Sequence, residues 1–97
     1  MIALNVIYTV KEGKMDEVLR LLARMKDLVK AKEPGCVLYQ VSKSQSDENI
    51  LLLYEVYQDQ LALDAHGNTE HFEEIVKKEV VPRLESRVRT AFDVVIQ

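Results

Sequence analysis

The two histidines, His66 and His71, are the only side chains whose ordinary pKa suits proton transfer near neutral pH. The pattern predicts that His66 ends a short helix, on the edge that carries Ala62 and Leu63, so that it can lean inward as a general base. The alternative is a histidine at a helix C-terminus that interacts with the helix dipole and faces water. His71 falls in the first turn of the next helix, where the second interpretation is preferred.

Polar residues that interrupt apolar strands are the other candidates for chemistry. They are Asn5 between Leu4 and Val6, Glu55 between Tyr54 and Val56, and Asp93 between Phe92 and Val94. Side chains alternate between the two faces of a strand, and each of these three residues lies on the less apolar face. If those faces together form the helix-covered face of a sheet, the three residues line a cleft with a few placed polar groups. The alternative is that they lie near strand ends and bond to helix termini or water.

Several kinds of site are disfavoured by the same residues. The histidines are separated by a helix break, and no Cys or acidic cluster has ligand spacing, so we expect no metal. The three glycines are scattered, so no phosphate loop is expected. Cys36, the single cysteine, is typical of a small buried residue in a reducing cytosol. Tyr39, Tyr54 and Tyr57 could contact an aromatic ligand, although aromatic residues in strands usually belong to a core or an interface.

Length and charge favour one globular domain over residues 1–97. The net charge is −3, from 13 basic and 16 acidic residues that are interspersed, and no basic stripe indicates a nucleic-acid partner. The apolar amino-terminal segment lacks a basic region and a cleavage site, so it indicates a strand and not a signal peptide. No apolar run approaches the roughly 20 residues of a membrane-spanning helix. We therefore expect a cytoplasmic protein without a membrane partner.

Hydrophobic periodicity predicts the elements that position these residues. Strands are expected at 2–10, 36–43, 49–57 and 88–96, and a helix at 14–32 that Glu33-Pro34-Gly35 ends. Asp59 caps a short helix over 60–66, and Asn68 or Thr69 caps another that ends or kinks at Val81-Pro82. The inner face of this last helix is Phe72, Ile75, Val76 and Val80. The order is that of an α+β, ferredoxin-like βαββαβ fold, with a four-stranded antiparallel sheet and its helices on one face.

Both faces of this sheet are apolar, which predicts a partner. One parity reads Leu4, Val6, Tyr8, Val10 and Ile50, Leu52, Tyr54, Val56, while the other offers Ala3, Ile7, Leu51 and Leu53. The helices suffice to cover only one face. A self-complementary homodimer is the simplest way to cover the second.

The segments EPGCVLYQV and LLLYEVYQDQLALDAHGNTEHFEEI, followed by a closing strand, resemble the antibiotic biosynthesis monooxygenase family of dimeric α+β barrels. The likeness covers roughly residues 2 to 95. It implies a pocket in each subunit between sheet and helices, with two sheets packed into a barrel. Asn5 matches a polar pocket position on the first strand, His66 the histidine of an Ala-His element, and Glu55 the acid of a Tyr-Glu element.

The resemblance implies a cofactor-independent monooxygenase acting on a small phenol or quinol. His66, Asn5 and Glu55 would be catalytic, and Tyr39, Tyr57, His71 and Phe72 would contact the substrate. Relatives also include an isomerase of a furanone signalling metabolite and stress-response domains without an established reaction. Two departures from the family pattern matter. Val76 stands where haem-degrading members carry a histidine, which disfavours haem, and the chain has no tryptophan, which is common in family pockets.

Overall fold

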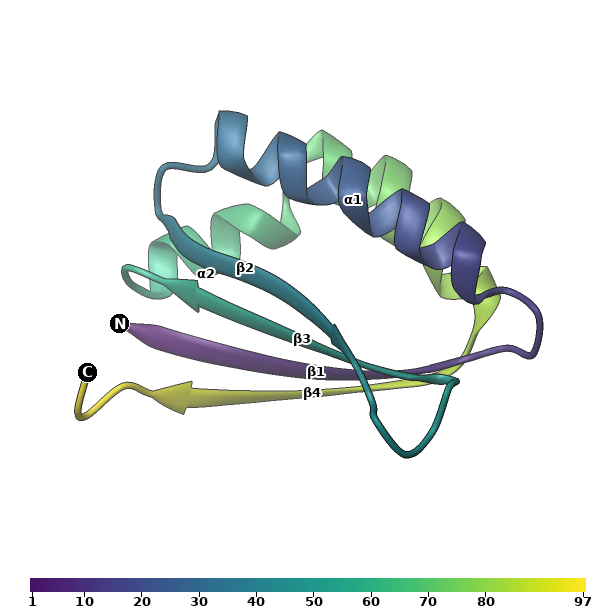
Figure 1. The fold of residues 1–97 in the computed structure, drawn as a ribbon. Helices are drawn as coiled ribbons and strands as arrows, with labels where there is room; N and C mark the ends of the chain where they lie inside the picture. The colour runs from purple at the N-terminus through teal and green to yellow at the C-terminus, as the bar shows by residue number, and fades with distance from the viewer.

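A computed structural model describes all residues, 1–97. The elements follow the order β1 (Ile2–Val10), α1 (Met15–Lys32), β2 (Cys36–Lys43), β3 (Ile50–Tyr57), α2 (Gln60–Gly67), η1 (Phe72–Val80), η2 (Val81–Arg83) and β4 (Leu84–Asp93). Figure 1 shows the helical segments in one layer above a twisted sheet. None of the helices has the length and apolar composition that crossing a bilayer requires.

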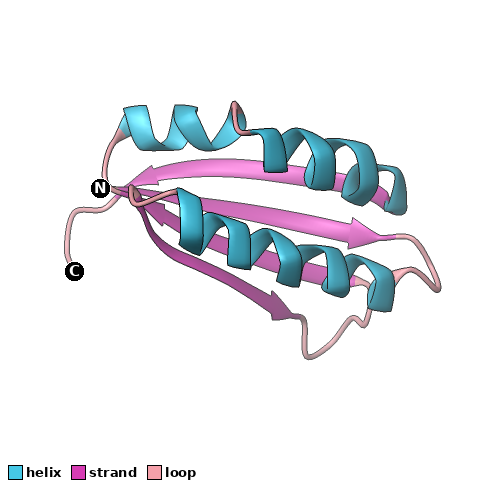
Figure 2. Ribbon diagram, turned by 90° about the horizontal axis from the view of Figure 1, so that it is seen from above, coloured by secondary structure: helices cyan, strands magenta, loops and turns pink.

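The four strands form one antiparallel sheet in the order β2-β3-β1-β4. Seen from above, α1 runs side by side with the α2 and η1 segments over the same face (Figure 2). The predicted α+β, ferredoxin-like arrangement with helices on one face is therefore confirmed. The strand β4 is an edge of the sheet, so its side chains on the helix side border open solvent.

The core lies between this sheet and the helices. The register pairs Val6 with Leu53 and Leu4 with Glu55, so these residues share the helix-covered face. The sequence analysis placed Leu4 and Val6 on the same face of the sheet as Ile50, Leu52, Tyr54 and Val56. This expectation is therefore wrong. A shift of register by one residue turns every side chain of a strand to the other face. The apolar stripe of α1 covers this face with Val18, Leu22, Met25 and Val29, all buried.

A close approach between Gly35 and α2 brings the end of α1 to the site described below. A Cβ atom added to Gly35 would lie 2.6 Å from the Cβ of Ala62, so a side chain cannot be accommodated there without movement. The carbonyl of Gly35 also accepts a hydrogen bond of 2.9 Å from the amide of Gln58, directly before α2. The Glu33-Pro34-Gly35 turn is thus held against the start of α2.

The carboxyl-terminal third differs from the sequence prediction in two details. The segment η1 winds with π-helical hydrogen bonds, and the amide of Val81 donates to the carbonyl of Val76. Pro82, which has no amide hydrogen, then falls in the short 3-10 turn η2, and the last strand begins at Leu84. It ends at Asp93, so the predicted bounds of 88–96 were displaced toward the carboxyl terminus. The predicted inner face of the helix is buried or half-buried.

Candidate functional site

His66 lies in the interior, as the inward-leaning interpretation predicts. Asp59 caps α2 by accepting a hydrogen bond of 2.8 Å from the amide of Ala62, as expected from the sequence. This short, capped helix points its last turn at the sheet, and the His66 residue is only 5% exposed. Its ring packs against Tyr57 and Phe72, with ring centroids 5.4 and 5.1 Å away. The imidazole is therefore fixed by packing as well as by hydrogen bonds.

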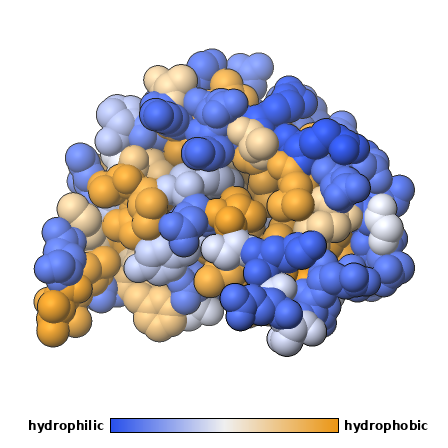
Figure 3. Space-filling model, viewed as in Figure 1, coloured by the Kyte–Doolittle hydropathy of each residue, from blue (hydrophilic) through white to orange (hydrophobic).

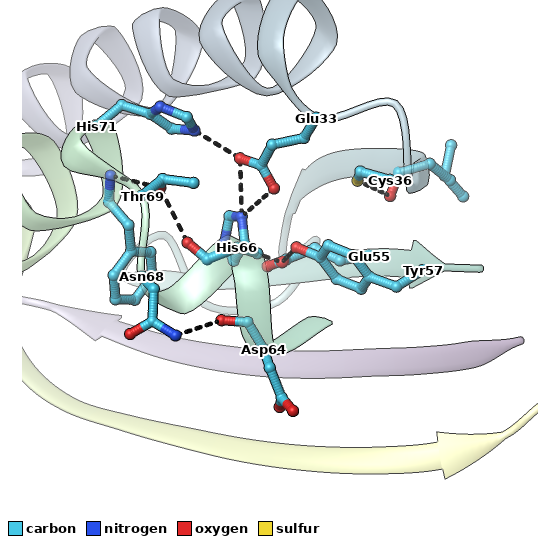
Figure 4. Close-up of polar contacts among 11 residues, drawn as sticks. Glu33, Cys36, Glu55, Tyr57, Asp64, His66, Asn68, Thr69 and His71 are labelled. Atoms are coloured by element: carbon cyan, nitrogen blue, oxygen red, sulfur yellow. Dashed lines mark hydrogen bonds and ion pairs between the residues drawn. The ribbon is translucent and has the colours of Figure 1, made fainter. Parts of the chain in front are cut away.

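Glu33 joins the two histidines. The Nδ1 of His66 lies 2.8 and 3.1 Å from the carboxylate oxygens of Glu33, and the Nε2 of His71 lies 2.5 Å from its Oε2 (Figure 4). A carboxylate can only accept hydrogen bonds, so both ring nitrogens that face it are donors. With the proton of a neutral His66 on Nδ1, the lone pair of Nε2 points away from Glu33.

The position of Glu33 in the chain is unfavourable for a carboxylate unless such partners are present. It is the C-cap of α1, where the helix dipole is negative. Burial pushes the pKa of Glu33 upward, but the hydrogen bonds and charges of His66 and His71 outweigh it and lower the pKa below its ordinary value. The residue therefore remains ionised and acts as an anionic bridge between α1, α2 and the start of η1.

Glu55 lies on the other side of the His66 ring. Its Oε1 is 3.7 Å from the Nε2 of His66 and accepts a hydrogen bond of 2.6 Å from the hydroxyl of Tyr57. Burial raises the pKa of Glu55, and neither the Tyr57 hydrogen bond nor His66 cancels the rise. Burial and the neighbouring Glu55 likewise raise the pKa of Tyr57, which keeps its proton and remains a donor. His66 is thus flanked by an ionised carboxylate and by a carboxyl group whose neutral form is favoured.

His66 and Glu55 border a cavity of about 220 Å³ between the sheet and the helices. Its floor is formed by all four strands, and its roof by α2 and η1. The volume suits a molecule of about one aromatic ring, and the lining is largely apolar with a few polar groups, as in many small-molecule sites. The lining residues are Leu4, Val6, Tyr8, Tyr39, Leu53, Glu55, Leu63, His66, Gly67, Phe72, Val76, Arg87 and Arg89.

The predicted substrate contacts divide into two pairs. Tyr39 and Phe72 line the cavity, so a ligand there would meet their rings. Tyr57 and His71 do not line it; they hold the carboxyl groups of Glu55 and Glu33 instead. The preference for a solvent-facing His71 was wrong, because the residue is only 8% exposed.

Asn5 is not in this cavity. It pairs with Tyr54 and Thr90 on the face of the sheet that carries no helices, opposite to Glu55 and His66. The expectation that Asn5 and Glu55 line the same cleft is therefore wrong within one chain, because the register places them on opposite faces. The Oδ1 of Asn5 is buried there and has no hydrogen-bond partner. Asp93 is exposed at the end of β4.

The arrangement can remove a proton from a bound molecule. The ring of His66 is oriented by Glu33, its Nε2 is free to accept a proton, and the residue lines a largely apolar cavity. Cys36 is not an activated nucleophile, because burial raises the pKa of its thiol to about 11. No group of three or more His, Cys, Asp or Glu side chains is placed to hold a metal ion.

Sequence comparison now identifies the family. The sequence model of the antibiotic biosynthesis monooxygenase family matches residues 1–78. The chain belongs to this family. Its resemblance to the family, inferred from the Glu33-Pro34-Gly35 and Ala65-His66 elements, is thereby confirmed. The family match does not extend to a substrate.

Solved structures of similar proteins agree with the fold. A candidate antibiotic biosynthesis monooxygenase of Caulobacter crescentus CB15 is 28% identical, with a TM-score of 0.93 over 98% of this chain and 90% of that one. A conserved protein of Methanosarcina mazei Go1 is 26% identical, with a TM-score of 0.87 over 94% and 89% of the two chains.

An uncharacterized protein of Synechocystis sp. is 39% identical over 46 residues, or 47% of this chain; the match spans only 31% of that protein's length.

Proposed function

We propose that the protein is a cofactor-independent monooxygenase that oxidises a small phenol or quinol in the cavity between sheet and helices. One observation carries the proposal. The Nδ1 of His66 lies 2.8 Å from an ionised Glu33, which leaves the Nε2 as a proton acceptor at a largely apolar cavity. A histidine oriented in this way by a carboxylate is the arrangement that general bases use in many enzymes.

The chemistry begins with transfer of a phenolic proton to the Nε2 of His66. The phenolate is electron-rich and passes electrons to molecular oxygen, which is the oxidant. For hydroquinone the balance is one quinol plus one O₂ giving one hydroxybenzoquinone plus one water. One oxygen atom forms a bond to a ring carbon and the other leaves as water, with the two hydrogens that the quinol loses.

The remaining groups assist this step. Glu33 holds the tautomer of His66, and His71 holds Glu33, so both are positioning residues. Burial raises the pKa of Glu55, which accepts the Tyr57 hydroxyl, and this favours the protonated form; that form donates a hydrogen bond to a substrate oxygen as negative charge develops there. Tyr39 and Phe72 pack against the ring.

Isomerisation of a small enediol or furanone is a second candidate. The observation that favours it is the separation of 3.7 Å between the Nε2 of His66 and the Oε1 of Glu55. Two proton-carrying groups this close can take a proton from one carbon of a bound molecule and return one to its neighbour. This reaction consumes no oxygen, and a domain that only binds a small molecule consumes none either.

The proposal includes a homodimer in the cytoplasm. The helix-free face of the sheet carries Ile7, Val88 and Phe92, whose exposed fractions are 37%, 59% and 51%. The buried, unpartnered Oδ1 of Asn5 lies on the same face. Figure 3 shows a further hydrophobic area at the end of the molecule where the chain terminates. A second copy would cover this face and offer a donor to Asn5. A single free cysteine suits a reducing compartment.

Oxygen uptake tests the function. The purified protein is mixed with a panel of quinols and with enediol and furanone compounds, and the product is analysed by mass spectrometry under ¹⁸O₂. We expect uptake of one O₂ for each quinol and one labelled oxygen atom in the product. Conversion of an enediol without oxygen uptake would favour isomerisation, and binding without any conversion would favour the non-enzymatic alternative.

A further inference from the structure

Two arginines stand at the open side of the cavity without an ionic partner. Arg87 and Arg89 are two residues apart on the edge strand β4, so their side chains share one face of the sheet. Their register partners are Tyr8 and Val6, both buried under the helices, and both arginines line the cavity. Arg83 is the only arginine that forms ion pairs, and its partners are Glu17 and Glu79.

The positive charges of Arg87 and Arg89 act on two ionisable groups that line the cavity, Tyr8 and Glu55. Burial raises the pKa of Tyr8 to about 12, and Arg87 opposes the rise. Burial also raises the pKa of Glu55, and Arg89 is one of the groups that oppose it. Both arginines are exposed, and neither forms an ion pair with a carboxylate. In an acidic chain, with 16 acidic and 13 basic residues, such a pair is a local positive site.

Two other donors of the cavity, the hydroxyls of Tyr8 and Tyr39, also lack partners. Both tyrosines line the cavity, and the hydroxyl of neither forms a hydrogen bond with the protein, although the hydroxyl of Tyr57 does. Burial raises the pKa of Tyr39 as well as that of Tyr8, so both hydroxyls keep their protons and can donate. The cavity thus presents hydrogen-bond donors from its mouth to its interior.

We propose that the substrate of this site is an acid, whose carboxylate or phosphoryl group is bound by Arg87 and Arg89 while its phenolic part reaches His66. The inference rests on the proposed function for the role of His66. The strand β4 is separated from β3, which carries Glu55, by two strand intervals, or about 10 Å. One aromatic ring with an acidic substituent spans that distance when the long arginine side chains reach inward. The guanidinium fork suits either anion.

The test is binding under anaerobic conditions, so that turnover does not interfere. Three probes are titrated by calorimetry: hydroquinone, 2,5-dihydroxybenzoate and 4-hydroxyphenyl phosphate. The variants are Arg87→Gln/Arg89→Gln and, as a control, Arg24→Gln on the exposed surface of α1. We expect at least one acid to bind the wild type about tenfold or more tightly than hydroquinone. The double variant should lose this preference and keep its affinity for hydroquinone, and the control should behave as the wild type.

The outcomes separate this proposal from the proposed function. Which acid gains more affinity from the arginines distinguishes a carboxylate from a phosphoryl substrate. Binding of an acid that depends on the arginines, without oxygen uptake, would support the acid site and refute the monooxygenase. Equal affinity for all three probes, no binding of either acid at millimolar concentration, or an unchanged preference in the double variant would overturn the acid site, whatever the oxygen assay gives.

Discussion

The Nδ1 of His66 lies 2.8 Å from the Oε1 of Glu33, although 33 positions separate the two residues in the chain. His66 lies in the last turn of α2 and Glu33 is the C-cap of α1, and the close contact of Gly35 with Ala62 brings these two helices together. The pair fixes which nitrogen of His66 faces the cavity. The proposed base therefore depends on a residue that makes no direct contact with the cavity.

Replacing His66 by alanine tests the base. We expect turnover of any quinol found as a substrate to fall by roughly 10²–10⁴-fold, the usual contribution of a general base. The free energy of unfolding should also fall, by about 1–3 kcal/mol, because the ring is buried and a hydrogen bond to Glu33 is lost. Leu61→Ala, an 80% exposed position on the same helix, is the control for activity and for denaturant unfolding. Full activity of the His66 variant would refute the assignment.

Replacing Glu33 by glutamine tests the positioning role without changing the shape of the side chain. A glutamine can donate its amide hydrogen to the Nδ1 of His66, which would move the ring proton to Nε2 and remove the base. We expect kcat to fall by roughly 10²–10⁴-fold, as in a protease triad whose aspartate is changed to asparagine. The KM should change little, because Glu33 does not line the cavity. A rise in KM at constant kcat would indicate that the residue supports binding alone.

The substitutions Glu33→Gln and Glu55→Gln should change the pH dependence of stability in opposite directions. The folded-state pKa of Glu33 is lowered, so its contribution to stability is present above its ordinary value of 4.5 and is lost as the pH falls below it. Glu33→Gln should therefore unfold with a weaker dependence on pH below 4.5 than the wild type. The pKa of Glu55 is raised, so its ionisation disfavours the folded state as the pH rises above 4.5. Glu55→Gln should gain stability over the wild type at neutral pH. Melting curves between pH 3 and pH 8 test this. The prediction would be contradicted if both substitutions raised, or both lowered, the melting temperature at neutral pH.

The proposed dimer can be tested at Val88, which is 59% exposed on the helix-free face. Sedimentation equilibrium at micromolar concentration should give about twice 11.2 kDa for the wild type. Val88→Glu should give a folded monomer, because a charge is tolerated at an exposed position but is costly in an apolar interface. Leu61→Glu, at an exposed position on α2, should remain dimeric. A monomeric wild type would refute the dimer.

The fold was predictable from the sequence because the strands and helices carry their own local patterns. The β-branched run over residues 2–10 and the apolar stripe of α1 are typical of a strand and a helix, and β1 has the predicted bounds. The pairing register was not predictable, since it depends on contacts between distant strands. For this reason Asn5 was assigned to the wrong face of the sheet.

The site was predictable only in part, for the same reason. Glu55 interrupts an apolar strand, and His66 is one of only two histidines in the chain, so each was visible as a candidate. Glu33 was missed, because its partners are 33 and 38 positions away. A carboxylate at the negative end of a helix is unfavourable by itself, and that signal could have revealed it. The alternation of Arg87 and Arg89 along one strand was a similar signal for the mouth of the cavity.

The central claim is that His66 takes a proton from a phenol in the cavity. A chromophoric phenol such as 4-nitrophenol, added without oxygen at a pH below its own pKa, tests this directly by absorbance. The wild type should bind it with the spectrum of the phenolate, while His66→Gln should bind it with the spectrum of the neutral phenol. A neutral spectrum with the wild type, or the same phenolate spectrum with both proteins, would contradict the claim.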